Sequence, residues 1–388
     1  MRIARIILFA ALAALALEAA AADRVKIGFL STMSGPGGYF GTEALAGFNL
    51  FLKMHDGRLG NLPAEVIVAD DQFNAETGKQ AAERLVKRDR VDFVAGTING
   101  NVIVPAVPVV TEGQRFLISA IAGPSDLAGA QCSPWFYSAG YQNDTPHEAV
   151  GRHLQDKGLK NIVTLVPNFV SGKDAVAGLK RQYKGGIAAE IFVKIGQLDY
   201  GAELAQIRSL NPDGVFIFLP GAMGVNFLKQ FQQNGLLGKI PLYGFGFNFD
   251  EDIINAVGES VVGSFNALHW GRDLDNAANR TFVARFEQEY KRPASAYAAM
   301  GYEVAQVIDA GVRDSGGRLE DAAAVRRALS AANFASIRGD FKFNVNHMPI
   351  QNFYLREVVK NGSRVENKIL GTIFTAYQDS FAKDCRMP

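Results

Sequence analysis

Histidine is the side chain of this sequence best suited to metal binding or proton transfer. Its five histidines stand at positions 55, 147, 153, 269 and 347, scattered over 388 residues. His147 and His153 are six positions apart on a predicted helix, which places them on different faces of that helix. No spacing typical of metal ligands joins any of the five, so we interpret them as core or surface histidines.

Motifs of known active sites are absent. The chain has no G-x-S-x-G elbow, no H-E-x-x-H, no phosphate loop ending in G-K-[ST] and no C-x-x-C. We therefore expect no catalytic residues, no cofactor and no metal centre. A secreted enzyme that lacks a recognisable motif is kept as an alternative of a different class.

Small, polar and aromatic residues follow the predicted strands, where open α/β sheets bind ligands. The glycine-rich stretch Ser31–Thr42 precedes a helix whose free N–H groups would favour an anion, although it also fits a plain strand–helix turn. Amides at the next strand end either cap a helix or face a ligand. The residues concerned in the first half are Asn99, Asn101, Ser119, Ala120 and Ala122, and those in the second half are Phe169, Ser171, Pro220, Gly221 and Ala222.

Four rings alternate with other residues in P-L-Y-G-F-G-F-N-F-D, residues 241–250. If this segment is extended, its period of two places Tyr243, Phe245, Phe247 and Phe249 on one side. The rings then belong either to a strand that faces the core or to the wall of a binding pocket.

Short apolar runs alternate with longer amphipathic ones, which predicts βαβ units and parallel sheets. After residue 143 this alternation starts again, and the chain ends with consecutive helices and hairpin-like strands. No low-complexity linker separates the two halves, so we expect a tight hinge between two α/β lobes. The strands are predicted at 25–31, 64–71, 91–97 and 115–120 in the first half, and at 161–166, 188–195, 214–219 and 241–246 in the second.

The length and charge of the chain limit its class. A chain of 388 residues favours two domains, and a net charge of +1 does not suggest a nucleic acid or an anionic membrane as partner. Residues 1–22 combine Arg2 and Arg5, an apolar run over 6–17 and a small-residue cleavage site at Ala20-x-Ala22, the layout of a secretory signal peptide. No later run reaches 18 apolar residues, so we expect a soluble exported protein that begins near Asp23.

Cys132 and Cys385 are the two cysteines of the chain. In an oxidising compartment such a pair predicts a disulfide, whereas the alternative is two buried free thiols.

The whole mature sequence resembles the solute-binding proteins of ABC transporters, in the branched-chain amino acid (Leu/Ile/Val) binding family. The resemblance rests on V-K-I-G-F-L-S-T-M-S-G-P near residue 25, D-D-Q-F-N-A-E-T-G-K-Q-A-A-E-R-L-V at 70–86 and Y-A-A-M-G-Y-E-V-A-Q at 297–306. It implies two Rossmann-like lobes joined by a three-strand hinge, the class I periplasmic binding protein fold. It also implies a monomer in the periplasm that serves an inner-membrane ABC permease. The implied division is 23–141 with 270–348 for the first lobe, and 142–269 with 349–388 for the second.

The same resemblance implies where a ligand would bind. A carboxylate would meet Gly100, Asn101 and the segment Ala120, Ile121 and Ala122, with further contacts from Phe40, Tyr141 and Gln142. The acid that meets an ammonium group in amino-acid-binding relatives falls on Gly246, flanked by Phe245 and Phe247.

Because a buried ammonium without a partner is costly, the missing acid argues against an amino acid and favours an aromatic carboxylate of benzoate or phenylpropanoid type. The stretches A-G-P-S-D-L-A-G-A-Q-C-S-P-W-F and Y-Q-N-D resemble a subgroup associated with aromatic acids. The alternatives are a hydrophobic amino acid, with Asp250 or Glu251 as the acid, and the ligand-binding domain of a sensor.

Overall fold

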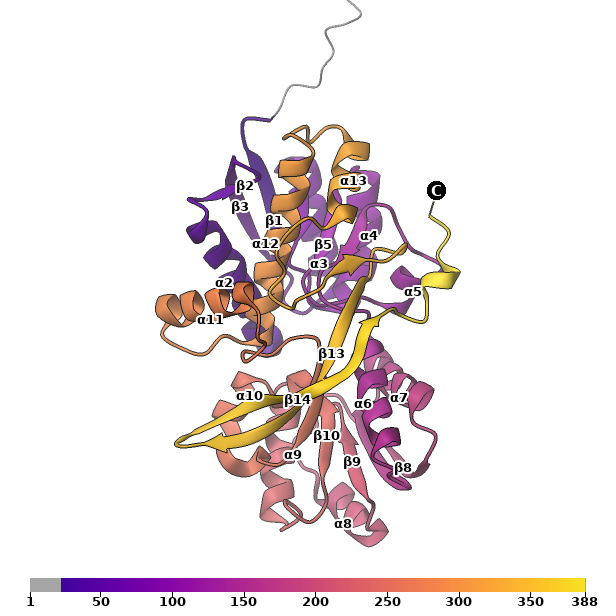
Figure 1. Ribbon diagram of the computed structural model, residues 1–388. Helices are drawn as coiled ribbons and strands as arrows, with labels where there is room; N and C mark the ends of the chain where they lie inside the picture. Colours follow the sequence, from indigo (N-terminus) through magenta and orange to yellow (C-terminus); the bar gives the residue numbers. More distant parts are fainter. Residues whose placement is uncertain (1–21, 388) are drawn as a thin grey trace, which may run out of the picture.

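The chain forms two α/β lobes, one above the other in Figure 1, with strands passing between them. The structure is a computed structural model that describes residues 22–387, so the predicted signal peptide at 1–22 lies outside the described residues except for its last position. Among the described residues, no helix is both long and apolar enough to cross a membrane. The same residues contain no cluster of three or more His, Cys, Asp or Glu side chains that could hold a metal ion.

The first lobe is built on a sheet in the order β2-β3-β1-β4-β5-β6. Strands β3, β1, β4, β5 and β6 are parallel, and β2 is antiparallel to β3. The strands β1, β4 and β5 are buried, whereas β3 is partly exposed. Because these strands are parallel, the loops after their carboxyl ends meet at one edge. The bounds are β1 (Val25–Ser31), β2 (Arg58–Leu59), β3 (Leu62–Asp70), β4 (Phe93–Ala95), β5 (Phe116–Ser119) and β6 (Phe136–Ser138).

Two helices from opposite ends of the first lobe's sequence, α2 (Gly38–Met54) and α12 (Ala296–Asp314), pack closely together. A side chain at Gly47 or Gly301 would overlap the backbone of the opposite helix, so glycine permits this close approach. The packing brings Phe40 and Tyr297, near the first residues of the two helices, into contact. The other helices of this lobe are α3 (Ala75–Glu83), which continues as a π-helical turn η2 (Arg84–Arg88), α4 (Gly100–Glu112), α5 (Ser125–Ala128), α11 (Ala277–Tyr290) and α13 (Ala322–Ala331), with the 3₁₀ turn η1 (Gly35–Gly37).

The second lobe has parallel strands in the order β11-β10-β9-β7-β8, and a long antiparallel hairpin of β13 and β14 joins at β11. Its helices follow the strands, as the alternating sequence pattern predicts. The strands are β7 (Asn161–Pro167), β8 (Gly186–Val193), β9 (Gly214–Ile217), β10 (Leu242–Phe245), β11 (Phe265–Leu268), β13 (Pro349–Asn361) and β14 (Arg364–Tyr377). The short strand β12 (Lys342–Phe343) pairs with the start of β13 and contacts α13 and Tyr137 of the first lobe. The helices are α6 (Thr145–Asp156), α7 (Val170–Gln182), α8 (Gly201–Leu210), α9 (Ala222–Gln233) and α10 (Glu251–Val257), with 3₁₀ turns η3 (Gly246–Phe249) and η4 (Gly258–Val261).

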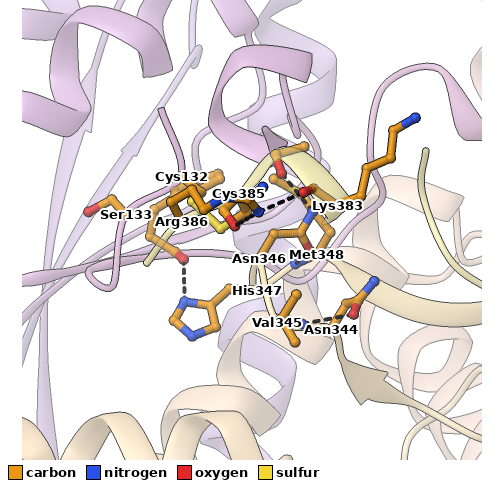
Figure 2. Close-up of a disulfide and its surroundings, with 12 residues drawn as sticks. Cys132, Ser133, Asn344, Val345, Asn346, His347, Met348, Lys383, Cys385 and Arg386 are labelled. Carbon is orange, nitrogen blue, oxygen red and sulfur yellow. Dashed lines mark hydrogen bonds between the residues drawn. A yellow bond between two sulfur atoms is a disulfide. The ribbon is translucent and has the colours of Figure 1, made fainter. Parts of the chain in front are cut away.

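The chain passes between the lobes after β6, after β11 and along β13, and it returns along β14 (Figure 1). The last residues therefore lie against the first lobe, where Phe381 packs on its core near the 3₁₀ turn η5 (Ala382–Asp384). Figure 2 shows the disulfide between Cys132 and Cys385 that holds this end. Residues 349–387 are thus divided: their strands extend the second lobe's sheet, whereas the end that we predicted in that lobe lies on the first.

Candidate ligand-binding site

A cavity of about 160 Å³ lies between the lobes, where the loops after the parallel strands of both sheets face each other. The first lobe lines it with residues that follow β4 and β5, and the second lobe with residues that follow β7, β9 and β10. An apolar cavity of about 150 Å³ is large enough to hold benzene. The size of this cavity therefore suits a ligand with a single ring.

Aromatic rings from both lobes form a continuous wall of the cavity. The ring of Phe247 lies 4.3 Å from that of Tyr297 on the first lobe and 4.4 Å from that of Phe245 on its own lobe. Phe40 stacks on the other side of this group, 4.7 Å from Tyr297. Tyr141, from the segment that crosses between the lobes, meets Phe245 edge to face at 5.4 Å. These contacts join the lobes around a space that is itself bordered by ring faces and edges.

Helix α4 begins at the cavity and presents backbone donors there. The N-cap residue Asn99 accepts a hydrogen bond from the N–H of Asn101 at 2.9 Å, while its buried Nδ2 atom has no partner among the described residues. Gly100, the first residue of the helix, lines the cavity. The N–H groups of Val102 and Ile103 bond to the carbonyl of Asn99, so the N–H of Gly100 is the one left free at this helix end among the described residues, beside the positive end of the helix dipole. This part of the first lobe is therefore suited to a carboxylate.

Helices α7 and α9 of the second lobe also begin at the cavity. Their N-cap residues, Phe169 and Gly221, both line it, and neither helix has a side-chain cap. Gly221 has a φ of 56°, a conformation that glycine adopts without strain. The first turns of both helices thus leave N–H groups available to polar atoms of a ligand.

His147 on α6 lines the cavity without supplying positive charge. Its ring is 4% exposed and lies edge-on to Phe216, Phe218 and Phe245. Burial lowers the pKa of His147 to about 3, so the imidazole is neutral at neutral pH. Its Nδ1 atom has no hydrogen-bond partner among the described residues. Since no Lys or Arg side chain occurs in the described lining, an anionic ligand would depend on backbone, amide and hydroxyl donors.

Asp174, on the second turn of α7, is the one acidic side chain in the lining. Its pKa is raised to about 6, chiefly by burial and also by nearby Asp144, while Arg181 opposes both effects. Arg181 is itself engaged with Asp144 at 2.5 Å and with Glu148 at 2.9 Å. Asp174 makes no hydrogen bond with the other described residues, so its carboxyl group is available to a ligand.

Most of the residues predicted from the sequence meet in this cavity, and they come from both lobes. The lining includes Phe40, Asn99, Gly100, Ile121, Ala122, Tyr141, Phe169, Pro220, Gly221, Phe245 and Phe247. The lining does not include Asn101, Ser119, Ala120, Gln142 and Gly246.

The predicted residues outside the lining are engaged elsewhere. The Ser119 hydroxyl donates to the carbonyl of Thr97 at 3.0 Å, and Ala120 is fully buried. Gln142 is buried, and its side-chain oxygen accepts from the N–H of Asp144 at 3.0 Å. Asn101 is exposed to solvent. These contacts explain why neighbours along the sequence differ in their access to the cavity.

Gly246 is separated from the cavity by the turn that begins there. The chain leaves β10 at Phe245 and enters the 3₁₀ turn η3, which ends the alternation of the rings: Phe247 faces the cavity and Phe249 enters the core. A Cβ atom at Gly246 would approach the guanidinium of Arg356 at 2.7 Å. A side chain at this position would therefore point toward Arg356, and the glycine does not determine the charge of the cavity.

Several lining residues were missed because the prediction concentrated on strand ends. Asp174 lies on the second turn of α7, beyond Phe169 and the predicted Ser171, which also lines the cavity, and Phe218 lies two residues before Pro220, inside the predicted strand 214–219. Tyr297 is the first residue of the Y-A-A-M-G stretch, where it signalled only a family resemblance. The remaining missed residues are Phe73, Ile98, Asn143, His147 and Asn248.

Two α/β lobes that enclose a cavity between their strand ends define a hinged, two-lobed binding protein. Residues 24–363 match the periplasmic binding protein family, and the chain belongs to that family.

Relatives support this assignment over nearly the whole chain. A Leu/Ile/Val-binding protein homolog from Brucella melitensis is 28% identical over 355 residues, which cover 89% of this chain and 90% of that protein. The crystal structure of an ABC transporter solute-binding protein from R. palustris in complex with benzoate is 31% identical and has a TM-score of 0.87, covering 94% of this chain and 99% of the other. A solute-binding protein of an ABC transporter from Rhodopseudomonas palustris BisB5, in complex with 3,4-dihydroxybenzoic acid, is 26% identical with a TM-score of 0.85, covering 92% and 99%.

Proposed function

We propose that this protein binds a single-ring aromatic carboxylate, of the benzoate type, in the periplasm and delivers it as a monomer to an ABC importer. The observation that carries the proposal is a ring-lined cavity of about 160 Å³ with the N-terminus of α4 at its first-lobe side. The rings suit an aromatic body, and the N–H groups suit a carboxylate. The relative bound to benzoate and the predicted signal peptide support the same interpretation.

The protein would act by closing its two lobes on the ligand, without a chemical reaction. Contacts between the lobes already surround the cavity: the rings of Phe247 and Tyr297 meet, and Asp250 accepts a hydrogen bond from the N–H of Ala296 at 3.0 Å. A ligand that touches both lobes binds the closed form more tightly than the open form and shifts the equilibrium toward closure. The permease would then recognise the closed form.

A second candidate ligand is a hydrophobic amino acid, and Asp174 is the observation that favours it. An ammonium group could pair with this carboxylate while the ligand carboxylate meets α4. The two acids suggested by the sequence, Asp250 and Glu251, do not line the cavity, because Asp250 is fully buried against Ala296 and Glu251 pairs with Arg272.

Calorimetric titration of the purified mature protein tests the proposal. Benzoate, 4-hydroxybenzoate and a phenylpropanoid acid should each be compared with leucine, valine and phenylalanine. We expect heat of binding with at least one aromatic acid and none with leucine. Binding of leucine without binding of any aromatic acid would overturn the proposal in favour of the second candidate.

A further inference from the structure

We propose that Asp174 accepts a hydrogen bond from a hydroxyl group on the ligand ring, so that the site prefers a hydroxylated benzoate to benzoate itself. This inference rests on the proposed function, and it assigns to one residue the choice among aromatic acids.

The position of Asp174 leaves its carboxyl group available to a ligand. It lies on the second turn of α7 and lines the cavity, and it makes no hydrogen bond with another described residue. The nearest cation, Arg181, is held by Asp144 and Glu148 on the neighbouring helix α6. The other charged groups acting on it are Asp144 and, from the first lobe, Asp126, and both repel its charge rather than neutralise it. A half-buried acceptor therefore faces the cavity without a partner.

A second unsatisfied polar group lies on the same lobe. His147 on α6 is more than nine-tenths buried and lines the cavity, and its Nδ1 atom has no partner among the described residues. The hydroxyl of Ser171 belongs to the same lining. A ligand that presents only hydrocarbon to this side would cover these groups without forming hydrogen bonds, which is unfavourable. A ring hydroxyl satisfies at least one of them.

The two lobes would bind opposite ends of the ligand. The negative charge of Asp174 disfavours a carboxylate on the second lobe, whereas the N-terminus of α4 and the Nδ2 atom of Asn99 favour it on the first. A ring held between the lobes then places the ring carbon opposite the carboxylate toward the second lobe. The substituent that best meets Asp174 is thus a hydroxyl opposite the carboxylate, as in 4-hydroxybenzoate.

Calorimetry on the wild-type protein and on Asp174→Asn and Asp174→Ala variants tests this assignment, with benzoate and 4-hydroxybenzoate as probes. A matched control is Asp156→Asn, which removes an exposed carboxylate from α6 of the same lobe. A hydrogen bond to a charged group corresponds to a preference of about tenfold or more. We expect the wild type and the control to prefer 4-hydroxybenzoate by that factor, and the Asp174→Ala variant to bind both probes alike, with Asp174→Asn between them.

Two results would overturn the inference and leave the proposed function standing: equal affinity of the wild type for both probes, or a full preference retained by both Asp174 variants. Failure of the wild type to bind either probe would overturn the proposed function and this inference together. A change in the control equal to that in the Asp174 variants would also contradict a specific role for Asp174.

Discussion

Replacing Phe247 by alanine tests whether the ring wall binds the ligand. Its ring is 4.3 Å from Tyr297 across the lobe boundary, 4.4 Å from Phe245 and 6.0 Å from Tyr141. Removing it loses one ring pair with the ligand and the contact with Tyr297 that helps to hold the lobes closed. Each ring pair contributes ~0.5–1.5 kcal/mol beyond burial, so we expect a loss of about 1–3 kcal/mol, which is roughly 5- to 150-fold in the Kd for benzoate.

The assay is calorimetric titration with benzoate, and Phe192→Ala is the matched control. Phe192 is on β8 of the same lobe, is 40% exposed and lies outside the cavity, so its replacement should leave the Kd unchanged. Phe247→Leu keeps apolar volume without a ring and should lose less affinity than Phe247→Ala. If Phe247→Ala binds benzoate as tightly as the wild type, the ring wall is not the ligand contact that we infer.

Three further predictions concern charge and the disulfide. Asn99→Asp keeps a good N-cap but places negative charge beside the N–H of Gly100 at the start of α4, so benzoate affinity should fall about tenfold or more with little change in Tm. Unchanged affinity would move the carboxylate away from α4. Burial is the main cause that raises the pKa of Asp174 to about 6, and the carboxylate of a bound benzoate would raise this pKa further. Benzoate binding therefore takes up protons, so the affinity of the protein for benzoate should increase as the pH falls from about 8 to 6. Titrations across that range check the sign, since an ammonium ligand would lower the same pKa and show the opposite dependence. Replacing Cys132 and Cys385 together by serine should reduce the free energy of unfolding by about 2–4 kcal/mol in denaturant titrations. The benzoate Kd should not change, because the disulfide lies outside the cavity. Equal stability of the wild type and the double variant under oxidising conditions would contradict this prediction.

The sequence by itself determined the two-lobed α/β architecture and the part of each lobe that faces the cavity. Alternating buried strands and amphipathic helices allow few arrangements, and parallel strands place the loops after their carboxyl ends along one edge. Residues as far apart as Asn99, Phe169 and Gly221 were predicted together for this reason, and they line one cavity.

Only the tertiary structure decided which side chains face that cavity. The alternation over Tyr243–Phe249 predicts a common side for its rings, but the 3₁₀ turn after Phe245 changes the period, so that Phe247 faces the ligand space and Gly246 faces Arg356. Asp174 and Tyr297 reach the cavity from helices whose placement depends on packing between segments distant in sequence. Strand periodicity specifies alternate faces within one element, whereas the direction of a side chain at a turn depends on the neighbours that the fold brings to it. The charge of the cavity was therefore not determined by the residue at position 246, and it depends on Asp174, which the second lobe presents from α7.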